Sequence, residues 1–230
     1  MHDLREDLDP VWRAANRLGA SHTDARSILL VACHAGEGTT SMAASLACIA
    51  ARRTDKPAWL VDLDLKRNPV LSGFEKGFAR DVGRPGRAYD ASLRQTPIYT
   101  VTPAADHKRQ SKLLTAHEIE GLSLLVTRFR NERLASGQTV QLQASPKWWQ
   151  ALRRISGWTI VDAPALERSS AALTMASQVD GVVLIVEADR TTAREVDSAA
   201  RELEASGARL MGTVLNRVGA DARLADRFSA

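Results

Sequence analysis

The chain has 230 residues, of which 44% are apolar and 25% are charged, and its formal net charge is +4. This length suits one sizeable α/β domain, and the ordinary composition excludes a disordered chain or a fibre. The mild positive charge does not by itself choose between nucleic acid, anionic lipid and an acidic polymer as a partner.

Residues 1–25 are polar and predict a helical segment whose apolar stretch is VWRAANRL. They contain no apolar signal region, and the chain nowhere approaches the roughly 18 consecutive apolar residues of a membrane span. Cys33 and Cys48 fall in a predicted strand and a predicted helix, where both are expected to be buried thiols rather than a disulfide. We therefore expect a cytoplasmic protein, any membrane role of which would run through a partner or through its surface.

Residues 26–220 predict a single α/β domain, followed by a short tail at 221–230. Short, continuous apolar runs alternate with turns and amphipathic stretches. Strands that are apolar at successive positions are buried on both faces, so the pattern predicts a mostly parallel central sheet flanked by helices on both faces. The expected strands of this sheet are 27–33, 58–64, 157–163, 181–187 and 209–216, and the expected helices are 41–53 and 190–207.

Within this domain, residues 72–150 predict an irregular insertion. Residues 74–91 carry several glycines and prolines, a composition typical of a loop. Ser145 followed by Pro146 is a typical helix start, with the serine as N-cap and the proline at the first helical position. The insertion is also expected to hold strands at 97–104 and 139–145 and a helix over 145–156.

The stretch ACHAGEGTTSMA, between the first predicted strand and the first long helix, has the form of a phosphate-binding loop. Backbone N–H groups in such a loop, together with the helix N-terminus, attract an anion. Gly36 and Gly38 permit close approach, and Thr40 stands where such loops place a magnesium-binding hydroxyl. Against the pattern G-x-x-x-x-G-K-[ST], however, Cys33 stands in place of the first glycine and Thr39 in place of the lysine. Taken alone, the stretch leaves a plain structural turn as an open alternative.

Carboxylates follow two of the predicted strands. Asp62 and Asp64 end the strand in WLVDLDLKRNP, and Asp162 ends the strand in WTIVDAPA. Ligands of open parallel sheets sit beyond the carboxyl ends of the strands, so these groups are expected near the glycine-rich loop, where they could hold Mg²⁺ directly or through water. The alternative is that acidic residues merely mark the ends of strands.

The ordered set GEGTTSMAASLA, LVDLDLKRNP, TIVDAPA, DGVVLIVEADRTT and GTVLNRV resembles the bacterial tyrosine kinases of polysaccharide export, in the MinD/ParA-like branch of P-loop ATPases. The resemblance implies a loop that binds ATP or ADP with Mg²⁺, with Asp162 as the Walker B aspartate and Asn216 near the adenine. The implied nucleotide-binding residues are Ala35, Gly36, Glu37, Gly38, Thr39, Thr40, Ser41 and Asn216. The implied magnesium ligands are Thr40, Asp64 and Asp162, and the implied catalytic residues of an active enzyme are Asp62 and Asp64.

The departures from this family bear on catalysis. Thr39 cannot neutralise the β- and γ-phosphates as the family's lysine does, and this loss weakens the stabilisation of a phosphoryl-transfer transition state. His34 falls near the further lysine of MinD-type loops, which reaches across a dimer, and a histidine is mostly neutral at pH 7. Lys66 or Arg67 could substitute for the missing charge.

Tyrosines are also scarce. The family's autophosphorylated cluster of C-terminal tyrosines is missing, and the only tyrosines are Tyr89 and Tyr99. The family's N-terminal E-x-x-R-x-x-R motif for ring assembly is not reproduced by Arg13 and Arg17. Any remaining activity is therefore expected to be ATP hydrolysis rather than tyrosine autophosphorylation.

Together these features favour a kinase-like regulatory protein, or pseudokinase, of bacterial exopolysaccharide synthesis and export. It would dock on the cytoplasmic part of a membrane co-polymerase or export protein, either alone or as a homo-oligomer, with no nucleic acid as partner. One alternative is a slow ATPase in which Lys66 or Arg67 replaces the lysine. Another is a MinD/ParA-type positioning ATPase, which would require an ATP-dependent dimer.

Overall fold

The computed structural model describes residues 1–17, 26–103 and 112–218. The expected tail at 221–230 lies outside these residues. The helices are α1 Asp9–Arg17, α2 Thr39–Arg53, α3 Pro69–Glu75, α5 Pro146–Ile155, α6 Ala171–Met175 and α7 Ala193–Ala205, with short 3-10 turns at Asn131–Arg133 and Ala176–Gln178. None of the helices in the described ranges is both long and apolar enough to cross a membrane.

The central sheet has the strand order β10-β9-β1-β8-β2-β6-β5-β3. Every neighbouring pair from β10 to β6 is parallel, and β5 and β3 are added antiparallel at one edge. The expected class, a mostly parallel sheet in an α/β fold, is confirmed. The strands are β1 Arg26–Ala32, β2 Ala58–Asp62, β3 Pro85–Asp90, β5 Leu114–Ile119, β6 Leu124–Phe129, β8 Trp158–Asp162, β9 Gly181–Glu187 and β10 Leu210–Asn216.

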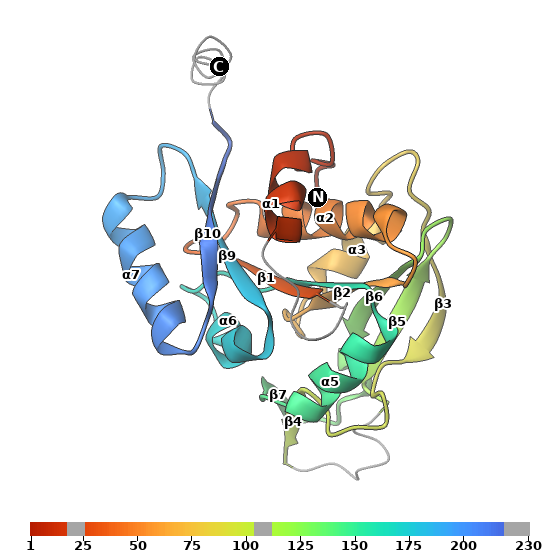
Figure 1. Ribbon diagram of the computed structural model, residues 1–230. Helices are drawn as coiled ribbons and strands as arrows, with labels where there is room; N and C mark the ends of the chain where they lie inside the picture. Colours follow the sequence, from red (N-terminus) through yellow and green to blue (C-terminus); the bar gives the residue numbers. More distant parts are fainter. Residues whose placement is uncertain (18–25, 104–111, 219–230) are drawn as a thin grey trace.

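Two hydrophobic cores lie on the two faces of this sheet (Figure 1). Leu30 and other residues of β1 with the same orientation pack against α1, α2 and α3, while Leu29 and Val31 pack on the side of α5, α6 and α7. Trp12 of α1 stacks near Trp158 of β8, with ring centroids 4.9 Å apart, so the N-terminal helix is part of the first core. The alternation along β1 explains why the predicted strands are apolar at every position.

The segment 72–150 is more regular than we expected. It contributes β3, β5 and β6 to the central sheet, and it also forms a separate antiparallel pair, β4 (Tyr99–Thr102) with β7 (Thr139–Leu142). Residues 74–91, expected to be a loop, include the end of α3 and all of β3. A Cβ on Gly83 would lie 2.1 Å from the carbonyl oxygen of Glu120, so this glycine permits close packing beside the β5–β6 turn.

Helix α5 begins where the sequence predicts, after Ser145 and at Pro146. The serine hydroxyl does not cap the helix, because it donates a hydrogen bond to the carbonyl oxygen of Thr96 at 2.6 Å. Trp148 and Trp149 are both buried, and the indole N–H of Trp148 donates to the carbonyl oxygen of Ala91 at 2.8 Å. These tryptophans therefore belong to the core rather than to a surface site.

Candidate functional site

The loop between β1 and α2 depends on its glycines. Gly36 and Gly38 have φ angles of 92° and 100°, in the left-handed region that favours glycine. A Cβ on Gly38 would also lie 2.2 Å from Nδ2 of Asn216 at the end of β10. That amide nitrogen donates a hydrogen bond to the carbonyl oxygen of Glu37 at 2.7 Å, so Asn216 packs directly on the loop.

The backbone N–H groups of residues 36–40 find no hydrogen-bond acceptor in the part of the chain that the structure describes. The two preceding N–H groups are occupied: that of His34 donates to Oε2 of Glu37 at 3.1 Å, and that of Ala35 donates to Oε1 of Glu167 at 2.7 Å. Unpaired N–H groups are rare in proteins, and a consecutive run of them at a helix N-terminus forms a concave binding site for an anion. We refer to residues 36–40 as the loop nest.

Thr40 and Asp162 meet beside the loop nest. The threonine hydroxyl donates to Oδ2 of Asp162 at 2.8 Å, whereas Oδ1 is buried and has no hydrogen-bond partner among the described residues. Asp162 is 3% exposed, and burial raises its pKa, with a further contribution from the charge of Asp64. A hydroxyl, an unpartnered carboxylate oxygen and a second carboxylate form the hard oxygen set that suits Mg²⁺, so the residues present fit this ion.

Asp62 and Asp64 differ in role although they are close in sequence. Asp62 is 2% exposed and accepts hydrogen bonds from the backbone N–H groups of Asp64, at 2.9 Å, and Val70, at 3.1 Å. Its side chain therefore fixes the turn after β2 to the start of α3. Asp64 lines the cavity over the loop nest, but Asp62 does not. This geometry does not support the catalytic role that we expected for Asp62.

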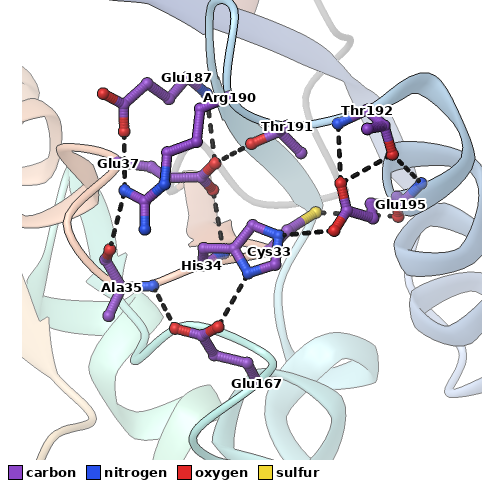
Figure 2. A network of polar contacts seen from close by, with 10 residues as sticks. All are labelled: Cys33, His34, Ala35, Glu37, Glu167, Glu187, Arg190, Thr191, Thr192 and Glu195. Atoms are coloured by element: carbon purple, nitrogen blue, oxygen red, sulfur yellow. Dashed lines mark hydrogen bonds and ion pairs between the residues drawn. The ribbon is translucent and has the colours of Figure 1, made fainter.

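A cavity of about 550 Å³ covers the loop nest, and we call it the nest cavity. It contains every residue that the sequence assigned to nucleotide binding except Glu37. The glutamate is fully buried and turned away, accepting hydrogen bonds from the backbone N–H of Glu187 at 3.4 Å and from the hydroxyl of Thr191 (Figure 2). Its side chain therefore links the loop to the end of β9. Residues lining the cavity include His34, Ala35, Gly36, Gly38, Thr39, Thr40, Ser41, Asp64, Arg67, Asp162, Arg168, Asn216 and Arg217.

His34 is held between two glutamates of its own chain (Figure 2). Its Nδ1 lies 2.8 Å from Oε2 of Glu167, and its Nε2 lies 3.0 Å from Oε1 of Glu195 in α7. The hydrogen bond to Glu167, followed by that to Glu195, raises the pKa of His34. His34, which we expected near the position of the MinD-type cross-dimer lysine, is thus engaged within its own chain in this structure.

The cations near the nest cavity differ from those we expected. Arg67 lines it, but Lys66 lines only an adjoining cavity of about 700 Å³, which does not include the loop nest. Lys66 is therefore not placed to replace the missing lysine. Arg168 lines both cavities, and sequence reasoning did not single it out. Its place six positions after Asp162, beyond the carboxyl end of β8, is the signal that could have identified it.

A scan against models of protein families finds no match. Among curated proteins, the tyrosine-protein kinase CpsD of Streptococcus agalactiae is 33% identical to this chain over 72 residues. The aligned part is 31% of this chain and 31% of the relative, so the match spans less than a third of the relative's length.

Solved structures resemble the chain over a larger part of its length. The kinase domain of VpsO is 21% identical with a TM-score of 0.58, and the match covers 94% of each chain. The cell division protein MinD of Aquifex aeolicus is 18% identical with a TM-score of 0.50, over 89% of this chain and 73% of that one. The cobyrinic acid a,c-diamide synthase of Mycobacterium smegmatis, solved with ADP and magnesium, is 12% identical with a TM-score of 0.50, over 89% and 81%.

These similarities confirm the fold class and the resemblance to bacterial tyrosine kinases of the MinD/ParA-like P-loop type. At these identities the structural matches show the fold alone.

Proposed function

We propose that this chain, which shares the fold of bacterial tyrosine kinases and of MinD, is a nucleotide-binding regulatory protein with impaired catalysis. The observation that carries the proposal is the loop nest, whose N–H groups have no acceptor among the described residues. All of its residues except Glu37 line the same cavity as Asp162. A chain of phosphates has the charge and the oxygen atoms to satisfy these groups.

The residues present also fit the two groups that a P-loop binds. The N–H groups of residues 36–40 would hold the phosphates of ATP or ADP, and Thr40, Asp64 and Asp162 would hold Mg²⁺. When bound, the ion neutralises phosphate charge. The protein positions the groups of this site through two hydrogen bonds. Asp162 fixes the hydroxyl of Thr40, and Asn216 fixes the shape of the loop through the carbonyl of Glu37.

Impaired catalysis follows from Thr39. This side chain lines the nest cavity at the place of the family's lysine, and it carries no charge. Phosphoryl transfer depends on fixed positive charge at the transferred group, so the expected consequence is binding with little or no turnover. Tyrosine autophosphorylation has little support either. Tyr99 is 1% exposed, and Tyr89 is 40% exposed with its hydroxyl donating to Glu118 at 3.1 Å.

The place of action rests on the family resemblance. We propose that the protein works in exopolysaccharide synthesis and export, at the cytoplasmic face of the inner membrane. Its partner there would be the cytoplasmic part of a membrane co-polymerase or export protein. In this role the nucleotide, rather than its hydrolysis, would set the shape of the surface that the partner recognises.

Isothermal titration calorimetry with ATP and Mg²⁺, combined with a phosphate-release assay, tests the proposal. The unmodified protein is expected to bind Mg-ATP and to release phosphate at the background rate, and a Thr39→Lys variant is expected to bind more tightly. Absence of nucleotide binding to the unmodified protein would contradict the binding site. Steady turnover, abolished by Asp162→Ala, would contradict impaired catalysis.

The alternative of a slow ATPase keeps one specific observation in its favour. Arg67 follows Asp64 closely, its backbone N–H donates to Oδ1 of that residue at 3.2 Å, and it lines the nest cavity. A guanidinium at this position could offset part of the missing charge. The phosphate-release assay separates this alternative from a protein that only binds nucleotide.

A further inference from the structure

We infer that Arg168, with Arg67 beside it, supplies the positive charge for the terminal phosphates that Thr39 cannot supply. This inference rests on the proposed function, because it assigns a role inside the same nucleotide site. Neither arginine has an ion-pair partner in the described part of the chain, although both line the nest cavity. Unpaired guanidinium groups that line one cavity are well suited to bind a phosphate through paired hydrogen bonds.

The segment that carries Arg168 is attached to the loop. The backbone N–H of Leu166 donates to the carbonyl oxygen of Ala32 at 2.9 Å, and that of Glu167 donates to the carbonyl oxygen of Cys33 at 3.2 Å. The carboxylate of Glu167 then accepts from the N–H of Ala35. These contacts attach Leu166 and Glu167, the two residues before Arg168, to the loop. They therefore fix the position of the Arg168 backbone relative to the loop nest.

Arg67 is fixed on the wall formed by the turn after β2. Its backbone N–H donates to both the carbonyl oxygen of Asp64, at 3.1 Å, and Oδ1 of the same residue. Arg67 and Arg168 also line the adjoining cavity together with Asp64 and Pro164, so they stand where the two cavities meet. Both arginines therefore come from loops that follow the strands bearing the predicted magnesium ligands.

The other basic groups that line the nest cavity, and Arg190 near the loop, are less suited to this role. Arg217 pairs with Glu187 at 2.7 Å, and Arg190, close to Gly36, pairs with the same glutamate at 2.9 Å. His34 is engaged by Glu167 and Glu195. Lys76 lines the cavity and has no ion-pair partner within residues 1–17, 26–103 and 112–218, but it follows α3 and has no hydrogen bond to the loop or to the carboxylates.

The test compares nucleotides that differ in the number of phosphates. Titration calorimetry with Mg-ATP, Mg-ADP and AMP is carried out on the full chain and on Arg168→Ala, Arg67→Ala and Arg168→Lys. Each alanine variant is expected to weaken ATP binding about tenfold or more, ADP binding less, and AMP binding little, because only the longer ligands reach the arginines. Arg168→Lys should recover part of the loss. A purely structural role would reduce the affinity for all three ligands alike.

Two further variants complete the design. Lys66→Ala, which removes a neighbouring cation that does not line the nest cavity, should leave the ATP affinity unchanged within about twofold. Adding Thr39→Lys to Arg168→Ala should restore ATP binding. Unchanged ATP binding in both arginine variants of a protein that binds nucleotide would overturn this inference and leave the proposed function standing. If only proteins with Thr39→Lys bound ATP, both would be overturned.

Discussion

The hydroxyl of Thr40 donates a hydrogen bond to Oδ2 of Asp162 at 2.8 Å, and the other oxygen of that carboxylate is buried with no partner in the described part of the chain. This pair joins the start of α2 to the end of β8. An unpartnered carboxylate oxygen in the interior costs free energy unless a ligand or water completes it. This oxygen is therefore available to the Mg²⁺ ion that we propose to bind beside the loop nest.

The first prediction concerns this pair. Thr40→Val keeps the shape of the side chain and removes the hydroxyl, so it should remove most of the magnesium dependence of nucleotide binding. Titration of ATP in Mg²⁺ and in EDTA measures that dependence. The unmodified protein should show a clear difference between the two conditions, and the variant a small one. Equal magnesium dependence in both proteins would exclude Thr40 as part of the cation site.

The second prediction separates the two aspartates after β2. Asp62→Ala leaves the buried N–H groups of Asp64 and Val70 without their acceptor, so it should lower the free energy of unfolding by about 1–3 kcal/mol. Asp64→Ala should change it by roughly 0.5 kcal/mol or less, and should instead weaken Mg-ATP binding. Urea unfolding and calorimetry measure the two effects. A stable Asp62→Ala protein with lost nucleotide binding would instead support a direct role for Asp62.

The third prediction concerns the pH dependence of stability. Glu167, and then Glu195, raise the pKa of His34 in the folded protein above its unfolded value. The protonated His34 therefore stabilises the folded protein fully below the unfolded pKa of about 6.5, and this stabilisation is lost as the pH rises through the raised pKa of the folded state. Both carboxylates are 43% exposed, so the effect should be roughly 0.5 kcal/mol.

His34→Gln, which cannot become charged, tests this dependence. The difference in unfolding free energy between the parent and the variant should be larger at pH 5.5 than at pH 8.5. Glu202 of α7 has no hydrogen bond or ion pair with the histidine, so Glu202→Gln is a matched control. The difference in unfolding free energy between the parent and this control should be the same at both pH values. A His34→Gln difference that does not vary with pH would show that the histidine remains neutral.

The fourth prediction uses two glycines with similar backbones. Gly38 and Gly137 both have positive φ, 100° and 80°, so alanine at either costs about 1 kcal/mol of backbone strain. Only at Gly38 would the new Cβ meet Asn216, whereas nothing lies within 4 Å at Gly137. Gly38→Ala should therefore destabilise the protein more and reduce nucleotide affinity, while Gly137→Ala should leave the affinity unchanged. Equal effects of the two substitutions would mean that the contact with Asn216 is unimportant.

Most strands of the parallel part of the fold were predictable because they are apolar at successive positions, and those at its centre are buried on both faces. Strand β6 (Leu124–Phe129), which pairs parallel with β2, was not predicted. Strand β5, with the sequence LTAHEI, and strand β3, with PGRAYD, were missed. They lie at the edge of the sheet, where β3 is mostly exposed and polar residues are tolerated, so their sequences do not show a continuous apolar run.

The candidate site was predictable in its main parts, because Gly36, Gly38 and Thr40 belong to a local pattern and the aspartates mark strand ends. The different roles of Asp62 and Asp64 were not predictable, since they depend on which backbone N–H groups of the turn lie near each carboxylate. Arg168 was missed for a related reason: an isolated arginine in a loop is typical of a solvated surface. Its attachment to the loop arises from backbone hydrogen bonds that leave no mark in the side-chain pattern.

We propose that the loop nest binds the phosphates of a nucleotide although Thr39 stands where a lysine is expected. The most direct measurement is a crystal structure of the protein with a non-hydrolysable ATP analogue and Mg²⁺. We predict phosphate oxygens within hydrogen-bond distance of the N–H groups of residues 36–40, with the cation beside Thr40 and Asp162. An analogue bound elsewhere, or a loop nest that remains without phosphate at saturating ligand, would contradict the claim.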